Sequence, residues 1–416
     1  WQWSSDEQFV LFNMYAVRVG DEVQLVALGD GKLPITFDSP DKYHHQIKCE
    51  VGGAAAVDAE VKLQYGGGRH ERGYMYELPE GIEGYPKKLH PLSLRAAQHT
   101  ALVVCPLPNK GRDWQQAVAG GVRIFGPAAE AGRGAFELTP DQHQVVPPPP
   151  RLPPRRGQPF SLVQCLCPIY NEGVAGFKKR DSRLLLEWLQ YHRSLGVTHV
   201  HVYKHIYEDP TSERVLAHFQ EQGFITVHDW RPKASEDITL HTYQRAKYLA
   251  MTDCYLRSRG AADFLVVGDL DELVYTGQKP LSGVLSWCYE QFKSSSLQKF
   301  AFSIASRTVL PFLSQQHQAM GSSLLFELMD TAETRCTAPF NCGKYHQGRQ
   351  KYFLRTAEPE LPLIIPWTHA VTRDYVYSDQ VHVQVAEAAA HVRHYSGQWF
   401  KEGLPADRTV AAPLPA

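Results

Sequence analysis

Two carboxylates, two residues apart, follow a short apolar run in the middle of the chain. Asp269 and Asp271, with Glu272 directly after them, come after the apolar residues 264–267. A short apolar run that ends in polar groups predicts a buried strand of an α/β sheet, and such sheets bind ligands beyond the carboxyl ends of their strands. Carboxylates at this spacing suit Mn²⁺ or Mg²⁺, which would neutralise a phosphate-bearing substrate. We interpret the motif as a metal site; a solvated turn that caps the next helix is the alternative.

The elements around this motif alternate between strand and helix. The apolar patterns predict strands at 160–167, 197–203 and 224–228 and helices at 181–195, 212–222 and 239–259. This order predicts a parallel, doubly wound sheet. The turn at Tyr170, Asn171 and Glu172 follows the first strand. We therefore expect these three side chains at the same sheet edge as Asp269.

A proline-rich stretch separates this region from a different pattern before it. Residues 147–159 contain prolines at a density that predicts an extended polyproline linker, although a ligand for a proline-recognition domain is a rival interpretation. Short strand-like runs separated by turn residues predict a smaller all-β sandwich at 1–146. The resulting domain prediction is a sandwich at 1–146, a linker at 147–159, a catalytic α/β domain at 160–400 and a tail at 401–416.

Composition places the chain among folded proteins without a general affinity for nucleic acid. It has 416 residues, 43% hydrophobic and 21% charged, with a net charge of −1. No apolar run reaches the length of about 18 residues that a membrane helix needs. Because the chain starts at Trp1, we expect that an N-terminal signal or anchor has been removed. The eight cysteines show no zinc-binding spacing, and their even number permits disulfides without requiring them.

Several motifs, taken in order, resemble the signature of glycosyltransferase family 92. They are residues 165–172, residues 186–192, Leu195-Gly196, Gln244-Arg245, residues 253–257, residues 269–272, residues 351–355, residues 367–369 and His394-Tyr395. The family includes plant β-1,4-galactan synthases and animal galactosyltransferases. The first half is similar to the β-sandwich that precedes the catalytic domain in plant members, where a carbohydrate-binding role is assigned. That similarity implies that Cys49 pairs with Cys105.

The resemblance implies a type A glycosyltransferase fold, Rossmann-like with a mostly parallel sheet. It also implies a Mn²⁺-dependent, inverting transfer of galactose from UDP-galactose to a glycan or polysaccharide acceptor, with Mg²⁺ as a second metal option. Golgi-lumen localisation would follow, with membrane contact only through the removed N-terminal anchor. Nucleic acid is not an expected partner, and formation of a homodimer is left undecided.

The same resemblance assigns roles to individual residues. The expected metal ligands are Asp269, Asp271 and His369. The expected contacts to the nucleotide sugar are Tyr170, Asn171, Glu172, Asp269, Lys351, Arg355 and His394. Inversion needs a base that takes the acceptor proton from the face opposite the leaving group. Asp330 is the favoured base and Glu327 the second choice, because both lie in the acidic segment 326–333.

One departure from the family affects the donor. Many members carry Tyr-Asp-Asn after the second strand, where this chain has Tyr203, Lys204 and His205. UDP-arabinose, UDP-xylose or UDP-glucose is therefore an alternative donor. A catalytically silent carbohydrate-binding protein that kept the fold is the alternative from another class.

Overall fold

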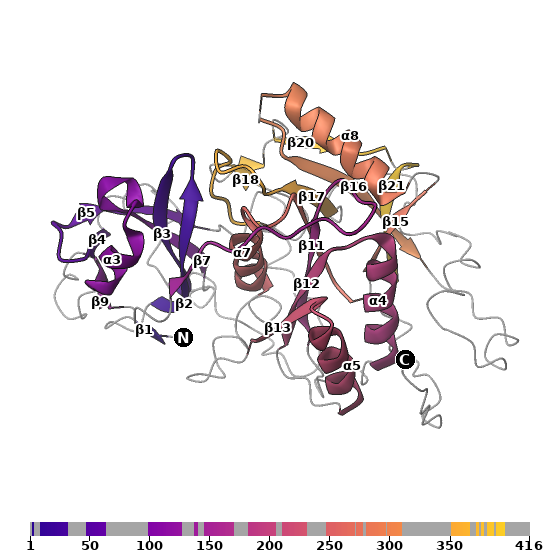
Figure 1. Ribbon diagram of the computed structural model, residues 1–416, viewed down its shortest axis with the longest axis horizontal. Coiled ribbons are helices and arrows are strands. Elements are labelled where there is room, and N and C mark those ends of the chain that lie inside the picture. Colours follow the sequence, from indigo (N-terminus) through magenta and orange to yellow (C-terminus); the bar gives the residue numbers. More distant parts are fainter. Residues whose placement is uncertain are drawn as a thin grey trace, which may run out of the picture.

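The structure is a computed structural model. It describes residues 2–3, 9–31, 47–63, 99–126, 137–139, 145–169, 182–204, 210–230, 247–270, 272–277, 280–296, 298–309, 351–366, 372–373, 376–377, 381–386 and 388–395. Two strand-rich parts lie side by side, and helix α7, Lys247–Ser258, lies between them (Figure 1). Among the described helices, none has the length and apolar character needed to cross a membrane.

The first part contains two sheets. One has the strand order β1-β2-β3-β7-β6 with β10 beside β2, and the other has the order β5-β4-β8-β9. Their bounds are β1 Gln2–Trp3, β2 Phe9–Val19, β3 Glu22–Gly31, β4 Lys48–Val51, β5 Val57–Asp58, β6 Glu60–Leu63, β7 His99–Pro106, β8 Val122–Phe125, β9 Glu137–Leu138 and β10 Val145–Val146. A 3-10 helix, Pro108–Gly111, and the short helix α3, Trp114–Ala119, stand between β7 and β8. The description "all-β" is therefore not confirmed.

The two sheets of the first part share a core that a disulfide crosses. Met14 and Leu25 of the larger sheet pack with Val51 and Ile124 of the smaller one, and all four are buried. Cys49 of β4 is bonded to Cys105 of β7. The predicted pairing of these two cysteines is confirmed.

The second part is built on a nine-stranded sheet with the order β13-β12-β11-β14-β17-β16-β21-β15, and β20 beside β16. Its bounds are β11 Leu162–Ile169, β12 His199–Lys204, β13 Ile225–Asp229, β14 Phe264–Gly268, β15 Glu272–Thr276, β16 Ala301–Val309, β17 Lys351–Arg355, β20 His382–Gln384 and β21 Ala390–Tyr395, with a separate pair β18 Thr372–Arg373 and β19 Val376–Tyr377. The helices are α4 Ser182–Leu195, α5 Pro210–Glu221, α7 Lys247–Ser258 and α8 Leu281–Ser294.

This sheet is parallel where the sequence predicted it to be and mixed beyond that point. Strands β13, β12, β11 and β14 run parallel to one another, whereas β17 is antiparallel to both β14 and β16. The mixed part begins after β14, beyond the strands and helices that the apolar patterns predicted. The expectation of a mostly parallel sheet therefore applies to the first four strands.

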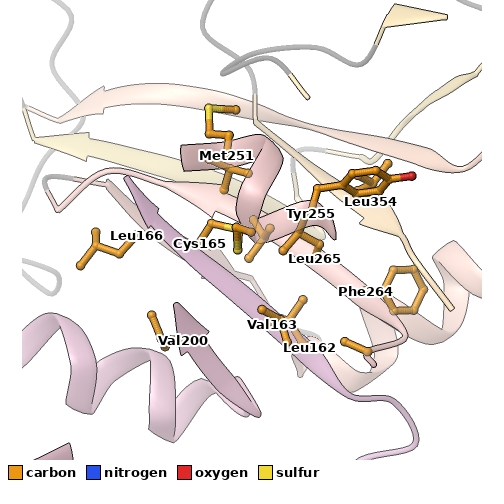
Figure 2. Packing of buried hydrophobic residues seen from close by; sticks show 14 of the residues in the cluster. Leu162, Val163, Cys165, Leu166, Val200, Met251, Tyr255, Phe264, Leu265 and Leu354 are labelled. Carbon is orange, nitrogen blue, oxygen red and sulfur yellow. A yellow bond between two sulfur atoms is a disulfide. The ribbon is translucent and has the colours of Figure 1, made fainter. Parts of the chain in front are cut away.

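Helix α7 packs on β11 and is covalently attached to it. Figure 2 shows Met251 and Tyr255 of α7 close to Cys165 of β11, with Leu166 and Val200 on the other side of the sheet. Cys165 is disulfide-bonded to Cys254 of α7. Spacing along the chain did not predict this bond, because the two cysteines are 89 residues apart.

The first part packs directly on α7 through the second face of its larger sheet. Side chains alternate along a strand, so residues next to those of the first core point the other way. Tyr15, Val26 and Val104 accordingly belong to the core of the second part and are buried there. Both faces of strands β2, β3 and β7 are therefore buried.

A buried carboxylate links the two parts at this interface. Asp253 of α7 is fully buried and accepts hydrogen bonds from the hydroxyl groups of Tyr15 and Tyr203. Arg257 donates its Nε–H to the same carboxylate at 2.7 Å. Burial raises the pKa of Asp253 above its ordinary value, while Arg257 lowers it.

The proline-rich segment lies against the second part and is not a free spacer. The Leu152 amide donates to the carbonyl of Ala261 at 2.7 Å, and Arg151 forms an ion pair with Asp263. The Arg155 guanidinium donates to the carbonyl of Arg193 at 2.9 Å. Prolines leave their carbonyls and the intervening side chains available for such contacts, so an extended segment can be fixed along its length.

Replacement of Tyr15 by Phe should lower the free energy of unfolding by about 1–3 kcal/mol, because the buried Asp253 carboxylate loses one of its donors. Urea unfolding measures the effect. The matched control is Tyr289→Phe, whose ring packs on Phe160. Equal losses in the two variants would show that the Tyr15 hydroxyl does not stabilise the interface.

A row of histidines crosses β12 and β13 beside this interface. His201 Nδ1 lies 3.0 Å from His228 Nε2, and the His199 ring is 5.1 Å from the His201 ring. Burial lowers the pKa of His228 to about 3, lowers the pKa of His199, and lowers the pKa of His201 well below its ordinary value. Burial also lowers the pKa of His192 in α4 to about 3. All four rings are therefore neutral in the folded protein near neutral pH.

Stability should fall as the pH drops below about 6.5, the ordinary pKa of histidine. A folded-state pKa below the unfolded value means that the unfolded chain binds more protons, so the stabilisation is complete above pH 6.5 and is lost toward pH 3. In this window each histidine changes the free energy of unfolding by up to about 1.4 kcal/mol per pH unit. The raised pKa of Asp253 acts in the opposite direction, but it is one group against four. Urea unfolding at pH 7.5 and 5.5 tests this; equal stability at both values would contradict it.

Candidate functional site

Several strand ends meet at one edge of the nine-stranded sheet. Leu166 of β11 pairs with Gly268, the last residue of β14, so both parallel strands end at this edge. Strand β17 is antiparallel to β14 with Val266 opposite Phe353, which brings the first residue of β17, Lys351, to the same edge. Asp269 follows β14 directly. The topology therefore gathers acidic and basic residues at the edge predicted from the sequence.

Two lysines lie directly against the acidic motif. The ammonium group of Lys247, in α7, is 2.8 Å from both carboxylate oxygens of Asp269. Lys351 Nζ is 3.4 Å from Asp269 Oδ2 and 2.9 Å from Glu272 Oε2. The side chain of Asp269 is 29% exposed, whereas the side chains of Lys247 and Lys351 are 5% and 1% exposed. The carboxylate of Asp269 is thus more exposed than the two ammonium groups that contact it.

Both lysines are charged. Burial lowers the pKa of an ammonium group, yet Asp269 and Glu272 together raise the pKa of Lys247 well above its ordinary value. The pKa of Lys351 is also raised, because Glu272 and Asp269 outweigh the effect of burial. Two cations and two carboxylates form a neutral, buried cluster.

The backbone around the motif is held by hydrogen bonds. The Asp269 amide donates to Glu272 Oε2 at 2.8 Å, which closes the turn between β14 and β15. Trp188 of α4 donates its ring N–H to the Glu272 carbonyl at 3.0 Å, and the Tyr191 hydroxyl donates to the Val274 carbonyl at 2.6 Å. Through these two hydrogen bonds, helix α4 holds the start of β15 in place.

Some of the predicted site residues meet here. Asp269 and Lys351 are in contact, and the backbone of His394 in β21 pairs with Glu272. Strand β11 ends at Ile169, one residue before the predicted turn. Outside the described residues lie Tyr170, Asn171, Glu172, Asp271, Glu327, Asp330 and His369.

The structure does not bring Arg355 to this edge. It pairs with Phe264, the first residue of β14, and so lies at the far end of the strand from Asp269. Its guanidinium donates to Asp263 at 3.1 Å and forms an ion pair with Glu358. Arg355 comes four positions after Lys351 along the strand, a distance of about 13 Å. Its position gives no support to the expected contact with a diphosphate.

Two members of the cluster were absent from the predicted site residues. Glu272 was recognised only as a neighbour of the carboxylate pair, and Lys247 was not singled out at all. A signal for Lys247 exists in the sequence: it lies three and seven residues before Ala250 and Cys254, on the apolar stripe of the helix. A lysine at such a position requires a buried partner.

The donor set fits a divalent cation only in part. Within the described part of the chain, no group of three or more His, Cys, Asp or Glu side chains is arranged to hold a metal ion. The carboxylate of Asp269 is of the right chemistry, but Lys247 contacts both of its oxygens. Asp271 and His369 belong to the part of the chain that is not described.

The structure thus has a mixed α/β sheet whose first four strands are parallel, with Asp269 directly after β14, and comparison with known proteins gives the family. The sequence profile of glycosyltransferase family 92 matches residues 161–410. The chain belongs to this family. The match begins after the proline-rich segment, so it does not cover the first part.

Individual relatives are distant. A glycosyltransferase family 92 protein of Caenorhabditis elegans is 26% identical over 124 residues, which are 28% of this chain and 23% of that protein. The chain thus matches less than a quarter of this relative's length.

Solved structures are also only remotely similar. A mannosyltransferase from Pyrobaculum calidifontis in complex with GDP-Man and Mn²⁺ is 14% identical, with a TM-score of 0.23 over 38% of this chain and 39% of that one. Glucosyl-3-phosphoglycerate synthase from Mycobacterium tuberculosis, in complex with Mn²⁺, UDP and phosphoglyceric acid, is 15% identical, with a TM-score of 0.21 over 37% and 45%. TM-scores this low do not establish a shared fold.

Replacement of Lys351 by Met should lower the free energy of unfolding by about 3–5 kcal/mol, because it leaves the buried Glu272 carboxylate without its ammonium partner. Urea unfolding measures this loss. Lys299→Met, at an exposed lysine, is the control and should change stability by less than about 0.5 kcal/mol. A loss no larger than that of the control would mean that the cluster does not depend on Lys351.

Proposed function

We propose that the protein is an inverting, metal-dependent glycosyltransferase that moves galactose from UDP-galactose to a glycan or polysaccharide acceptor. The observation that carries the proposal is the family match over residues 161–410, combined with the placement of Asp269 at the carboxyl end of β14. Donor sugar, linkage and inversion come from the resemblance of the motifs to galactan synthases and galactosyltransferases. Another UDP-sugar donor is the main alternative.

In this proposal the acidic and the basic residues at this end of the sheet have different roles. A bound Mn²⁺ would supply positive charge to the leaving diphosphate, and Asp271 and His369 are the residues proposed to hold it. Lys351, one of the two described lysines at this edge, is proposed to add positive charge near the diphosphate. Asp330, or Glu327 as second choice, is proposed to remove the acceptor proton. Tyr170, Asn171, Glu172 and His394 are proposed to contact the nucleotide sugar.

The compartment is also a proposal. The disulfides Cys49–Cys105 and Cys165–Cys254 favour an oxidising environment, because such bonds are rare in a reducing cytosol. A Golgi lumen is consistent with this and with the polysaccharide chemistry. A carbohydrate-binding role for residues 1–146 remains a prediction; the structure of this part supports first of all a packing role.

Turnover of a panel of UDP-sugars with Mn²⁺ tests the function. UDP-galactose should be the preferred donor, EDTA should abolish turnover, and Asp271→Asn should lower kcat/KM by a factor of about a hundred or more. Glu290→Gln, on the exposed side of α8, is the control and should be as active as the wild type. Turnover of a different UDP-sugar alone would replace the donor, and binding of glycans without any turnover would favour the silent alternative.

A further inference from the structure

We propose that Lys247 is a positioning residue for the donor site, and that it holds Asp269 as an internal counter-ion so that Asp269 does not bind the metal directly. The inference rests on the proposed function and deepens it. It assigns Asp269 to the protein's own cations and leaves direct metal binding to the other proposed ligands.

The first step is the geometry of the Asp269 carboxylate. Lys247 Nζ lies 2.8 Å from Oδ1 and 2.8 Å from Oδ2, so it occupies the edge between the two oxygens. That edge is where a cation would be chelated by both oxygens of one carboxylate. Lys351 adds a second ammonium at 3.4 Å from Oδ2. A divalent cation bound directly to Asp269 would therefore sit close to two positive charges.

The second step is that the lysines cannot easily move away. The side chains of Lys247 and Lys351 are 5% and 1% exposed, and an unpaired ammonium in such a place is strongly unfavourable. Lys351 is also held by Glu272 at 2.9 Å. If a metal took Asp269, it would leave the buried ammonium group of Lys247 without this carboxylate partner. The pairing is thus a fixed part of the folded site.

The third step is the rigidity of the element that carries Lys247. One disulfide, Cys165–Cys254, attaches α7 to β11, and Asp253 anchors the same helix to Tyr15 and Tyr203. Lys247 is the first described residue of this helix, two turns before these anchors. The ammonium group is therefore delivered from a fixed helix, and the side chain of Asp269 takes its orientation from it.

A charge-balanced double variant separates a positioning role from metal ligation. In Lys247→Met/Asp269→Asn one positive and one negative charge are removed together, so the net charge of the cluster is unchanged. Mn²⁺ is titrated by calorimetry in the presence of UDP into the wild type, this double variant and Asp271→Asn. We expect the double variant to bind Mn²⁺ within about fivefold of the wild type, and Asp271→Asn to lose about a hundredfold or more.

Kinetics of the single variants provide a second readout. Lys247→Met should lower kcat/KM for the donor on the order of a hundredfold, because the Asp269 carboxylate is no longer held in place, while Mn²⁺ affinity is kept. Lys247→Arg keeps the charge and should recover part of the activity. If Lys247 were needed only for folding, Lys247→Met would instead lower both the Mn²⁺ affinity and the melting temperature of the protein.

Loss of Mn²⁺ affinity in the double variant to the level of Asp271→Asn would overturn the inference and identify Asp269 as a metal ligand. If Lys247→Met does not fold, the double variant and Lys247→Arg still decide the question, because neither leaves an unpaired carboxylate. Failure of the proposed function gives a different pattern. A wild type that neither binds Mn²⁺ nor turns over any UDP-sugar would overturn both, whereas a wild type that is active and binds Mn²⁺ confines any failure to Lys247.

Discussion

The burial of both faces of one sheet governs the arrangement of this molecule. Strands β2, β3 and β7 contribute alternate residues to two different cores, such as Leu25 to one and Val26 to the other. A sheet buried on both sides needs a partner on each, and the second partner here is α7 of the second part. The end of the sheet that carries Asp269, the interface and the core of the first part are thereby connected through one helix, because α7 carries Lys247 at its first turn and Asp253 near its middle.

Electrostatics at the edge of the nine-stranded sheet follow from this connection. Four charged groups share a buried space, and each is stable only because the others are present. Helices α4 and α7 approach from opposite sides and fix the turn that carries Asp269. Such a preorganised arrangement suits chemistry in which charge develops on a leaving group, because the surrounding dipoles and charges do not need to reorganise.

The sequence predicted the local elements of the second part well and the long-range contacts poorly. The periodicity of the apolar residues and the turn residues between the segments predicted α4 and the parallel strands, since these elements depend on nearby residues. The Cys165–Cys254 bond, the position of Arg355 and the role of Lys247 all depend on which distant segments meet. Residues 351–355 were interpreted as one basic motif, but they form strand β17. Lys351 and Arg355 therefore lie at opposite ends of this strand. Both candidates for the catalytic base and two of the expected metal ligands lie outside the described residues.

The fixed proline-rich segment has a consequence for how this protein can be recombined. The family match begins at residue 161, directly after the fixed proline-rich segment. From the sequence alone, that segment would be the obvious junction at which to replace the N-terminal half by that of another protein. The shared core lies on both sides of that boundary, since Tyr15 and Asp253 belong to one hydrogen-bond network. A chimera joined at the prolines would therefore need the matching face of α7 from the same parent. In this molecule the unit of exchange is the sheet together with the helix that covers it, and not the segment of chain that the prolines delimit.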